Sequence, residues 1–215
     1  MGYFTIKDEA SSQFEEKKSI FIGHIKRVYT EDEAKSFINK IKTDYRDARH
    51  NVYAYVIGQN MGIQRYSDDG EPQGTGGIPV LEVIKKNEIT DVVIVVTRYF
   101  GGILLGKGGL VRAYSKGAAM AVNDGGIVEK VKGVVVDIIL DYDMLGKVQY
   151  LFEQKLWYVE STDYTDKVRL MMYCPVDKLK DVESSIIEVT NGKCQVIVGD
   201  EEYYFKFDNR LFKES

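Results

Sequence analysis

The chain of 215 residues is poor in the side chains that build metal sites and disulfide frameworks. Its two cysteines, Cys174 and Cys194, are far apart and lack CxxC spacing, which favours reduced, buried thiols. Only two histidines occur, His24 and His50, and neither an HExxH nor a GxSxG motif is present. The sequence therefore predicts no metal and no cofactor, and it favours a protein that is not an enzyme.

Long hydrophobic runs are also missing. The longest, such as residues 92–96 and 134–136, fall far short of the roughly 18 apolar residues that cross a bilayer. The start, MGYFTIKDEASSQ, has no basic segment followed by an apolar stretch and no small-residue cleavage site. With 44% hydrophobic and 12% aromatic residues, the chain can still build a core. We expect a folded cytoplasmic protein without a membrane partner.

Charge and glycine are divided unevenly along the chain. Residues 137–215 carry 10 Lys and Arg against 16 Asp and Glu, a net charge of −6, which leaves +2 for residues 1–136. Nine of the 20 glycines lie between Gly70 and Gly109. The turn-rich segment NDGGIVEKVKG, residues 123–133, separates the two compositions. The sequence predicts an N-terminal domain of residues 1–133 and a C-terminal domain of residues 134–215.

Hydrophobic periodicity predicts an α+β fold in both domains. The N-terminal domain has strand patterns followed by a β-α-β-α order, with a capping box at residues 30–33 and a continuous apolar run suited to a central strand at residues 91–99. Its expected strands are residues 19–28, 52–58, 62–67 and 91–99, and its expected helices are residues 30–45, 80–86 and 110–122.

The C-terminal domain has the order βαββαβ, the ferredoxin-like arrangement. Expected strands are residues 134–141, 157–164, 167–174 and 194–199 with 203–207, and expected helices are residues 142–155 and 177–190. This topology serves many functions and identifies none.

Glycines and basic residues gather where a buried strand ends and a helix begins. Residues 98–109 read RYFGGILLGKGG, and a helix amino terminus with glycine-rich backbone favours an anion. Because Arg98, Lys107 and Arg112 lie nearby, phosphate is the expected ligand. The alternative is that the glycines permit tight turns while the arginines pair with carboxylates at residues 68, 69 and 71.

Residues 101–107 and His50 each suggest a catalytic interpretation. Residues 101–107 match the first seven places of a P-loop, but Gly108 stands where a hydroxyl should hold magnesium, so hydrolysis of a nucleotide is disfavoured. His50 with Asp69 or Glu71 could form an acid/base pair, although a histidine before a strand is more often a hydrogen-bonding surface residue. Tyrosines of the region, including Tyr114, either stack on bases or fill a half-buried strand.

Three blocks resemble the Impact/YigZ family of conserved proteins: DARHNVYAYVIG (47–58), QRYSDDGEPQGTGGIPVL (64–81) and VVIVVTRYFGGILLGKGGLVRAYSKGA (92–118). The signature Arg-Tyr-Phe-Gly-Gly-x-x-Leu-Gly stands at residues 98–106, and SDDGEP at residues 67–72. Gly76 departs from the family pattern, where many relatives have Ala.

The resemblance implies a particular pair of folds and a link to translation. The N-terminal domain would share the β-α-β fold of a small-subunit ribosomal protein's second domain and of domain four of elongation factor G. The C-terminal domain would be ferredoxin-like, similar to the last domain of that factor. Eukaryotic relatives are translation regulators that bind the activator of an initiation-factor kinase. The residues matching the family pattern are His50, Asp69, Glu71, Arg98, Gly101, Gly102, Gly106, Arg112 and Tyr114.

These observations lead to one functional hypothesis and two alternatives. We expect a non-enzymatic cytoplasmic regulator, acting on translation, that binds RNA or the ribosome through those residues and Lys107. The acidic C-terminal domain would discriminate between ligands or bind a protein. The alternatives are an enzyme or binder that acts on a phosphorylated small molecule or nucleotide, with His50 or Asp69 handling protons, and a protein-binding adaptor.

Overall fold

A computed structural model describes residues 2–214, which form two compact units. One contains Tyr3–Val128, and the other contains residue 2 and residues 129–214. The expected division after residue 133 falls inside a single strand, β7 (Ile127–Leu140). The turn-rich segment is shorter than the sequence suggested, because its first residues complete a helix and Gly126 alone, with φ 66°, ends that helix. Each unit is described separately below.

The N-terminal domain is built on a five-stranded antiparallel sheet of order β2-β3-β6-β4-β5. Its elements are β1 (Tyr3–Ile6), β2 (Ala10–Glu16), β3 (Ser19–Arg27), α1 (Glu31–Asp44), β4 (His50–Ile57), β5 (Ile63–Ser67), α2 (Gly77–Lys86), β6 (Val92–Tyr99) and α3 (Gly106–Gly125). The first two strands were not predicted, because β1 has only four residues and the ASSQFEE sequence of β2 has no clear apolar face.

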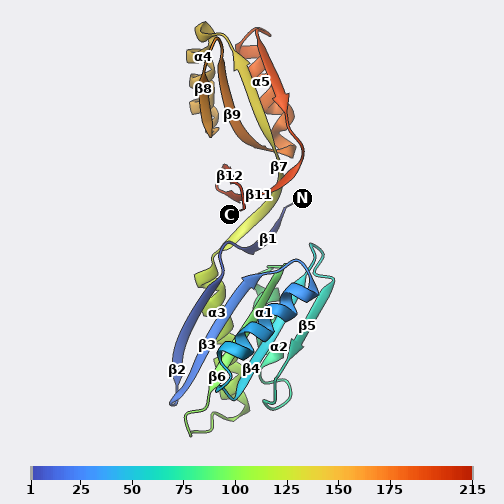
Figure 1. The fold of residues 1–215 in the computed structure, drawn as a ribbon, viewed down its shortest axis with the longest axis vertical. Coiled ribbons are helices and arrows are strands. Elements are labelled where there is room, and N and C mark those ends of the chain that lie inside the picture. Colours follow the sequence, from blue (N-terminus) through green and yellow to red (C-terminus); the bar gives the residue numbers. More distant parts are fainter. Residues whose placement is uncertain (1, 215) are drawn as a thin grey trace. The chain divides into compact units, whose positions relative to one another are not determined.

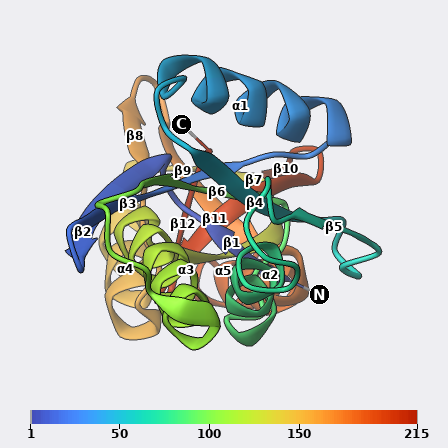
Figure 2. The ribbon, with the colours of Figure 1, turned by 90° about the horizontal axis from the view of Figure 1, so that it is seen from below.

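Helices cover both faces of this sheet. Figures 1 and 2 show α1 on one face and α2 with α3 on the other. Along β6, Val93 and Val95 pack in the core beneath α1, whereas Val92, Ile94 and Val96 pack in the core that includes α2 and α3. Burial on both faces explains the continuous apolar run and confirms the central position predicted for this strand.

A local sequence signal, the capping box, fixes the start of α1. Thr30 Oγ1 accepts a hydrogen bond from Glu33 N, and Glu33 Oε2 accepts one from Tyr29 N. The capping box therefore forms as predicted, except that the donor of its second bond is Tyr29, one residue before the N-cap.

Helix α3 lies close to β3 at Gly23, where a Cβ would collide with the backbone carbonyl oxygen of Gly117. Glycine at position 23 is thus required by helix–sheet contact.

The C-terminal domain has the predicted ferredoxin-like topology. Strands β10, β7, β9 and β8 pair antiparallel in that order, and the core lies between them and the two helices. The elements after β7 are α4 (Tyr142–Lys155), β8 (Ser161–Tyr164), β9 (Val168–Pro175), a 3₁₀ turn (Val176–Lys178), α5 (Leu179–Val189), β10 (Cys194–Val198), β11 (Glu202–Phe207) and β12 (Arg210–Phe212).

The chain after β10 does not extend that strand, as the sequence suggested. Instead β11 pairs with the first part of β7, at residues 129–133, and β12 folds back on β11 through a turn at Asp208. The α+β, two-domain fold class is confirmed. Across residues 2–214, no helix combines the length and the hydropathy that a membrane span requires.

Candidate functional site

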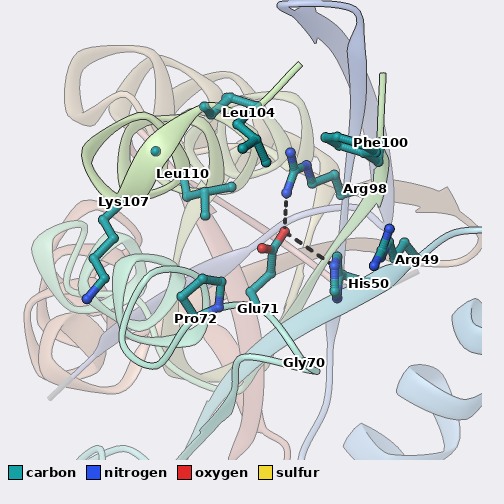
Figure 3. A pocket seen from close by; sticks show the side chains of 12 residues that line it. Arg49, His50, Gly70, Glu71, Pro72, Arg98, Phe100, Leu104, Lys107 and Leu110 are labelled. Carbon is teal, nitrogen blue, oxygen red and sulfur yellow. Dashed lines mark hydrogen bonds and ion pairs between the residues drawn. The ribbon is translucent and has the colours of Figure 1, made fainter. Parts of the chain in front are cut away.

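A hollow of about 440 Å³ opens in the N-terminal domain where β6 ends and α3 begins. His50 is the first residue of β4 and faces Arg98 across the β4–β6 pair. Figure 3 shows the hollow's lining side chains, which come from β4, β6, α3 and the loops before α2 and α3. They are Arg49, His50, Gly70, Glu71, Pro72, Arg98, Phe100, Leu104, Leu105, Gly106, Lys107 and Leu110.

A buried ion pair forms the floor of this pocket. Arg98 Nη1 donates to Glu71 Oε1 at 2.6 Å, and Tyr114 Oη donates to the same oxygen at 2.8 Å. The Arg98 and Glu71 side chains are 6% and 4% exposed. Burial, followed by the charge of Glu71, raises the pKa of Tyr114 far above its ordinary value, so its hydroxyl stays protonated and donates. Arg98 and Tyr114 therefore both donate hydrogen bonds to Glu71 within the protein.

His50 is oriented by the backbone of the SDDGEP loop. Its Nδ1 lies 2.8 Å from the carbonyl oxygen of Asp69. A carbonyl only accepts, so Nδ1 carries the hydrogen, and in the neutral ring Nε2 is the acceptor nitrogen. That Nε2 lies 3.9 Å from Glu71 Oε1. Proton transfer at His50 would thus involve Nε2, at the wall of the pocket.

The carboxylates of the same loop face inward. Asp69 accepts from Asn51 N through Oδ2 and from Lys42 Nζ through Oδ1, both at 2.6 Å. Asp68 accepts from three amides of the following loop, those of Gly74, Gly76 and Gly77. Burial alone would raise the pKa of Asp68, but these three hydrogen bonds outweigh it and hold the pKa below its ordinary value. Asp69 is consequently not placed to handle a proton in the pocket.

The first turn of α3 is an unneutralised helix amino terminus. Its N-cap residue is Leu105, which makes no side-chain hydrogen bond, and no acidic residue lies in the described first turn. By contrast, α1 has a capping threonine and three acidic residues in its first turn. The leading amides of α3 lack intrahelical acceptors and carry partial positive charge. Gly106 and Lys107 line the pocket, so this partial positive charge lies at the pocket wall.

The predicted site residues divide into two groups. His50, Glu71, Arg98, Gly106 and Lys107 line the pocket, whereas five others do not: Asp69, Gly101, Gly102, Arg112 and Tyr114.

Three residues of the second group, Gly101, Gly102 and Arg112, lie outside the lining for different reasons. Gly101 N donates to Ser19 Oγ, and a Cβ on Gly101 would collide with the carbonyl of Lys18, so this glycine joins two loops. Gly102 has φ 82°, a turn conformation that suits glycine. Arg112 is exposed on α3, away from the lining.

Seven lining residues were not selected from the sequence, and Arg49, Phe100 and Leu104 are the three among them that matter most for a ligand. Arg49 is exposed, and its amide donates to the Arg98 carbonyl, which brings it beside the pocket. The pairing of β4 with β6 was the signal that could have found it, because it sets residues 49 and 50 against the end of β6. Phe100 and Leu104 are 40% and 82% exposed.

Similarity to known proteins supports the same architecture. Residues 17–122 match the Impact N-terminal domain, and residues 138–193 match a domain of unknown function, DUF1949. The chain is 41% identical to the IMPACT family member YvyE of Bacillus subtilis over 98% of this chain and 97% of the relative. The chain belongs to the IMPACT family.

Two further similarities extend over most of this IMPACT family protein. It is 33% identical to an IMPACT family member of Haemophilus influenzae, over 89% of this chain and 94% of the relative. A solved structure, titled as the crystal structure of an hypothetical protein, has 29% identity and a TM-score of 0.58, covering 94% of this chain and 98% of its own. The solved structure thus shares the fold over most of this chain.

The pocket is equipped to bind an anion. Arg49, Lys107 and the amino terminus of α3 supply positive charge, and the one carboxylate in the lining, Glu71, is paired with Arg98. None of the described residues that line it is a serine, threonine or cysteine, so no hydroxyl or thiol nucleophile is present in the lining. The arrangement favours binding over covalent catalysis.

Proposed function

We propose that this IMPACT family protein regulates translation in the cytoplasm by binding RNA through the pocket of its N-terminal domain. The observation that carries the proposal is the convergence of Arg49, Lys107 and the uncapped start of α3 on one hollow. The nearby carboxylates of Asp68, Asp69 and Glu71 are all occupied by groups of the same chain. The positive charges of Arg49, Lys107 and the start of α3 are therefore not cancelled by these carboxylates, and they favour a phosphate in the pocket.

Apolar side chains at the rim suit the bases of a single strand. Phe100 is 40% exposed, and its ring centroid lies 5.4 Å from Arg98 Cζ and 6.0 Å from Arg49 Cζ. A ring held beside two guanidinium groups is a surface on which a base stacks, and such stacking tolerates any base. Phosphate at the pocket and a base on Phe100 would together hold one nucleotide.

The family resemblance supports a role at the ribosome, since it implies that both domains are similar to domains of elongation factor G. The C-terminal domain, with a net charge of −6 over residues 137–215, is unsuited to the RNA backbone. Its acidic surface would instead bind a protein partner or exclude unsuitable RNA. The N-terminal domain then carries the RNA contact.

A second candidate function is binding of a phosphorylated small molecule. It is favoured by the size of the pocket, because about 440 Å³ is within the range of small-ligand sites. Saturable binding of mononucleotides or sugar phosphates with no measurable affinity for RNA oligomers would favour this candidate over the first.

Titration of a fluorescent single-stranded RNA at several salt concentrations tests the proposal. The wild type is compared with the double variant Arg49→Ala/Lys107→Ala and with a matched double variant on α1, Lys35→Ala/Lys40→Ala. We expect affinity to fall with salt, and the pocket variant to reduce the slope of log K against log salt by about 1.4, roughly 0.7 for each lost phosphate contact. Salt-independent binding, or identical slopes for the two double variants, contradicts the proposal.

A further inference from the structure

The two oxygens of Glu71 have different surroundings. Oε1 accepts both hydrogen bonds that the carboxylate receives, from Arg98 Nη1 and Tyr114 Oη. Oε2 receives none from residues 2–214. Figure 3 shows the second oxygen turned away from Arg98 and His50, toward the side of the pocket where Leu110 and Pro72 lie. The side chain is only 4% exposed and it lines the pocket.

Oε2 is not one of the fully buried polar atoms, so water or a ligand in the pocket can reach it. The same floor holds a donor without a partner, since Arg98 Nε is buried with no acceptor among the described residues. A carboxylate accepts only, so a ligand that binds Oε2 in place of water must present an O–H or N–H group there. The floor of the pocket thus favours a ligand that donates a hydrogen bond.

The mouth of the pocket requires the opposite chemistry. Lys107 and the first amides of α3 favour an anion, whereas the open oxygen of Glu71 accepts hydrogen bonds only and does not bind a phosphate oxygen. A suitable ligand therefore carries a phosphate close to a hydroxyl group. In a ribonucleotide the 2′-hydroxyl adjoins the 3′-phosphate, whereas deoxyribose has no such hydroxyl.

We infer that Glu71 accepts a hydrogen bond from the ribose 2′-hydroxyl of a ribonucleotide whose phosphate lies at Lys107 and the amino terminus of α3. The inference rests on the proposed function and adds discrimination of RNA from DNA. A hydrogen bond to a charged acceptor contributes roughly a ten- to hundred-fold difference in affinity. A free ribonucleotide and a unit of an RNA chain offer the same chemistry.

Changing the ligand tests the inference without disturbing the fold. The full-length protein is titrated with one sequence in three backbones: RNA, DNA and 2′-O-methyl RNA, which lacks the donor. We expect RNA to bind at least ten-fold more tightly than either of the others at the same salt concentration. Equal, salt-dependent affinity for all three overturns the inference and leaves the proposed function standing. Absence of salt-dependent binding to any of them overturns both.

Adenosine 3′-monophosphate and its 2′-deoxy form, used as competitors, distinguish the sources of the ligand. Competition by the ribo form alone supports the inference for a free nucleotide as well as for RNA. Equal competition by both forms contradicts it.

The variant Glu71→Gln gives a second readout, since it retains the shape of the side chain and removes its charge. We expect the ratio of RNA to DNA affinity to fall toward one in the folded variant, as judged by its thermal unfolding. An unchanged ratio contradicts the inference. If Glu71→Gln fails to fold, the comparison of the three backbones decides the question with the wild type alone.

Discussion

Glu71 Oε1 and Arg98 Nη1 lie 2.6 Å apart in the interior of the N-terminal domain, and each side chain is less than one-tenth exposed. Arg98 was one of three cations that the sequence associated with a phosphate, together with Lys107 and Arg112. In the structure it neutralises a buried carboxylate, which is the alternative that the sequence left open. The exposed Arg49 and Lys107 are the cations available to a ligand.

Removal of one partner of this pair should be strongly destabilising. The change Glu71→Ala leaves the Arg98 guanidinium buried without its counter-ion, and we expect the free energy of unfolding to fall by about 3–5 kcal/mol. Chemical denaturation measures the effect. The matched control is Glu82→Ala, which removes an exposed ion pair with Lys85 and should change stability by less than about 1 kcal/mol. Equal losses in the two variants would show that Glu71 is not buried as described.

The close approach of α3 to β3 predicts a steric effect at Gly23. A Cβ there collides with the backbone carbonyl of Gly117, and neither backbone can move without displacing a packed element. We expect Gly23→Ala to lower the free energy of unfolding by roughly 1–3 kcal/mol. Gly146→Ala is the control, since no atom lies within 4 Å of a Cβ at that position. A neutral Gly23→Ala in thermal unfolding would contradict the helix–sheet contact.

The start of α1 offers a test of local structure. Thr30→Ala removes the acceptor of the Glu33 amide and should cost about 1 kcal/mol in unfolding free energy. Thr43→Ala is the matched control in the same helix, because the Thr43 hydroxyl donates only to the Asn39 carbonyl four residues earlier. We expect this control to be near neutral in urea denaturation. A larger loss for Thr43→Ala than for Thr30→Ala would be inconsistent with the cap.

His24 predicts how stability depends on pH. Burial lowers its pKa from 6.5 to about 4, although Glu9 and Asp44 act in the opposite direction. Because the unfolded chain binds this proton more readily, the contribution is intact above pH 6.5 and is lost as pH falls toward 4, on the order of 3 kcal/mol in total. Denaturation of the wild type and His24→Asn across this range measures the slope. The variant should show the shallower decrease, and parallel curves would refute the assignment.

Much of the fold could be predicted because its local signals agree with its packing. The run at residues 91–99 predicted a central strand, and the β6 side chains indeed pack on both faces. The capping box marked α1 correctly. β2 and β12 gave no such signal, since β2 is largely polar and β12 has only three residues, and each is held by pairing with the neighbouring strand of a hairpin.

The sequence selected residues around one pocket without showing how they are paired. Of the glycines and cations at residues 98–109, Arg98, Gly106 and Lys107 line the pocket. The sequence could not show that Glu71 turns inward to Arg98, because that depends on the SDDGEP loop closing over the end of β6. It also could not show that Asp69 binds Lys42 on α1.

The most direct test of the central claim is the titration of ¹⁵N-labelled protein with a short single-stranded RNA, followed through its backbone amide resonances. We expect saturable shifts concentrated at Gly106, Lys107 and Gly108, the first amides of α3, with Arg49 and Phe100 also affected. Unshifted amides at the start of α3 during demonstrable RNA binding, or shifts confined to the C-terminal domain, would contradict it.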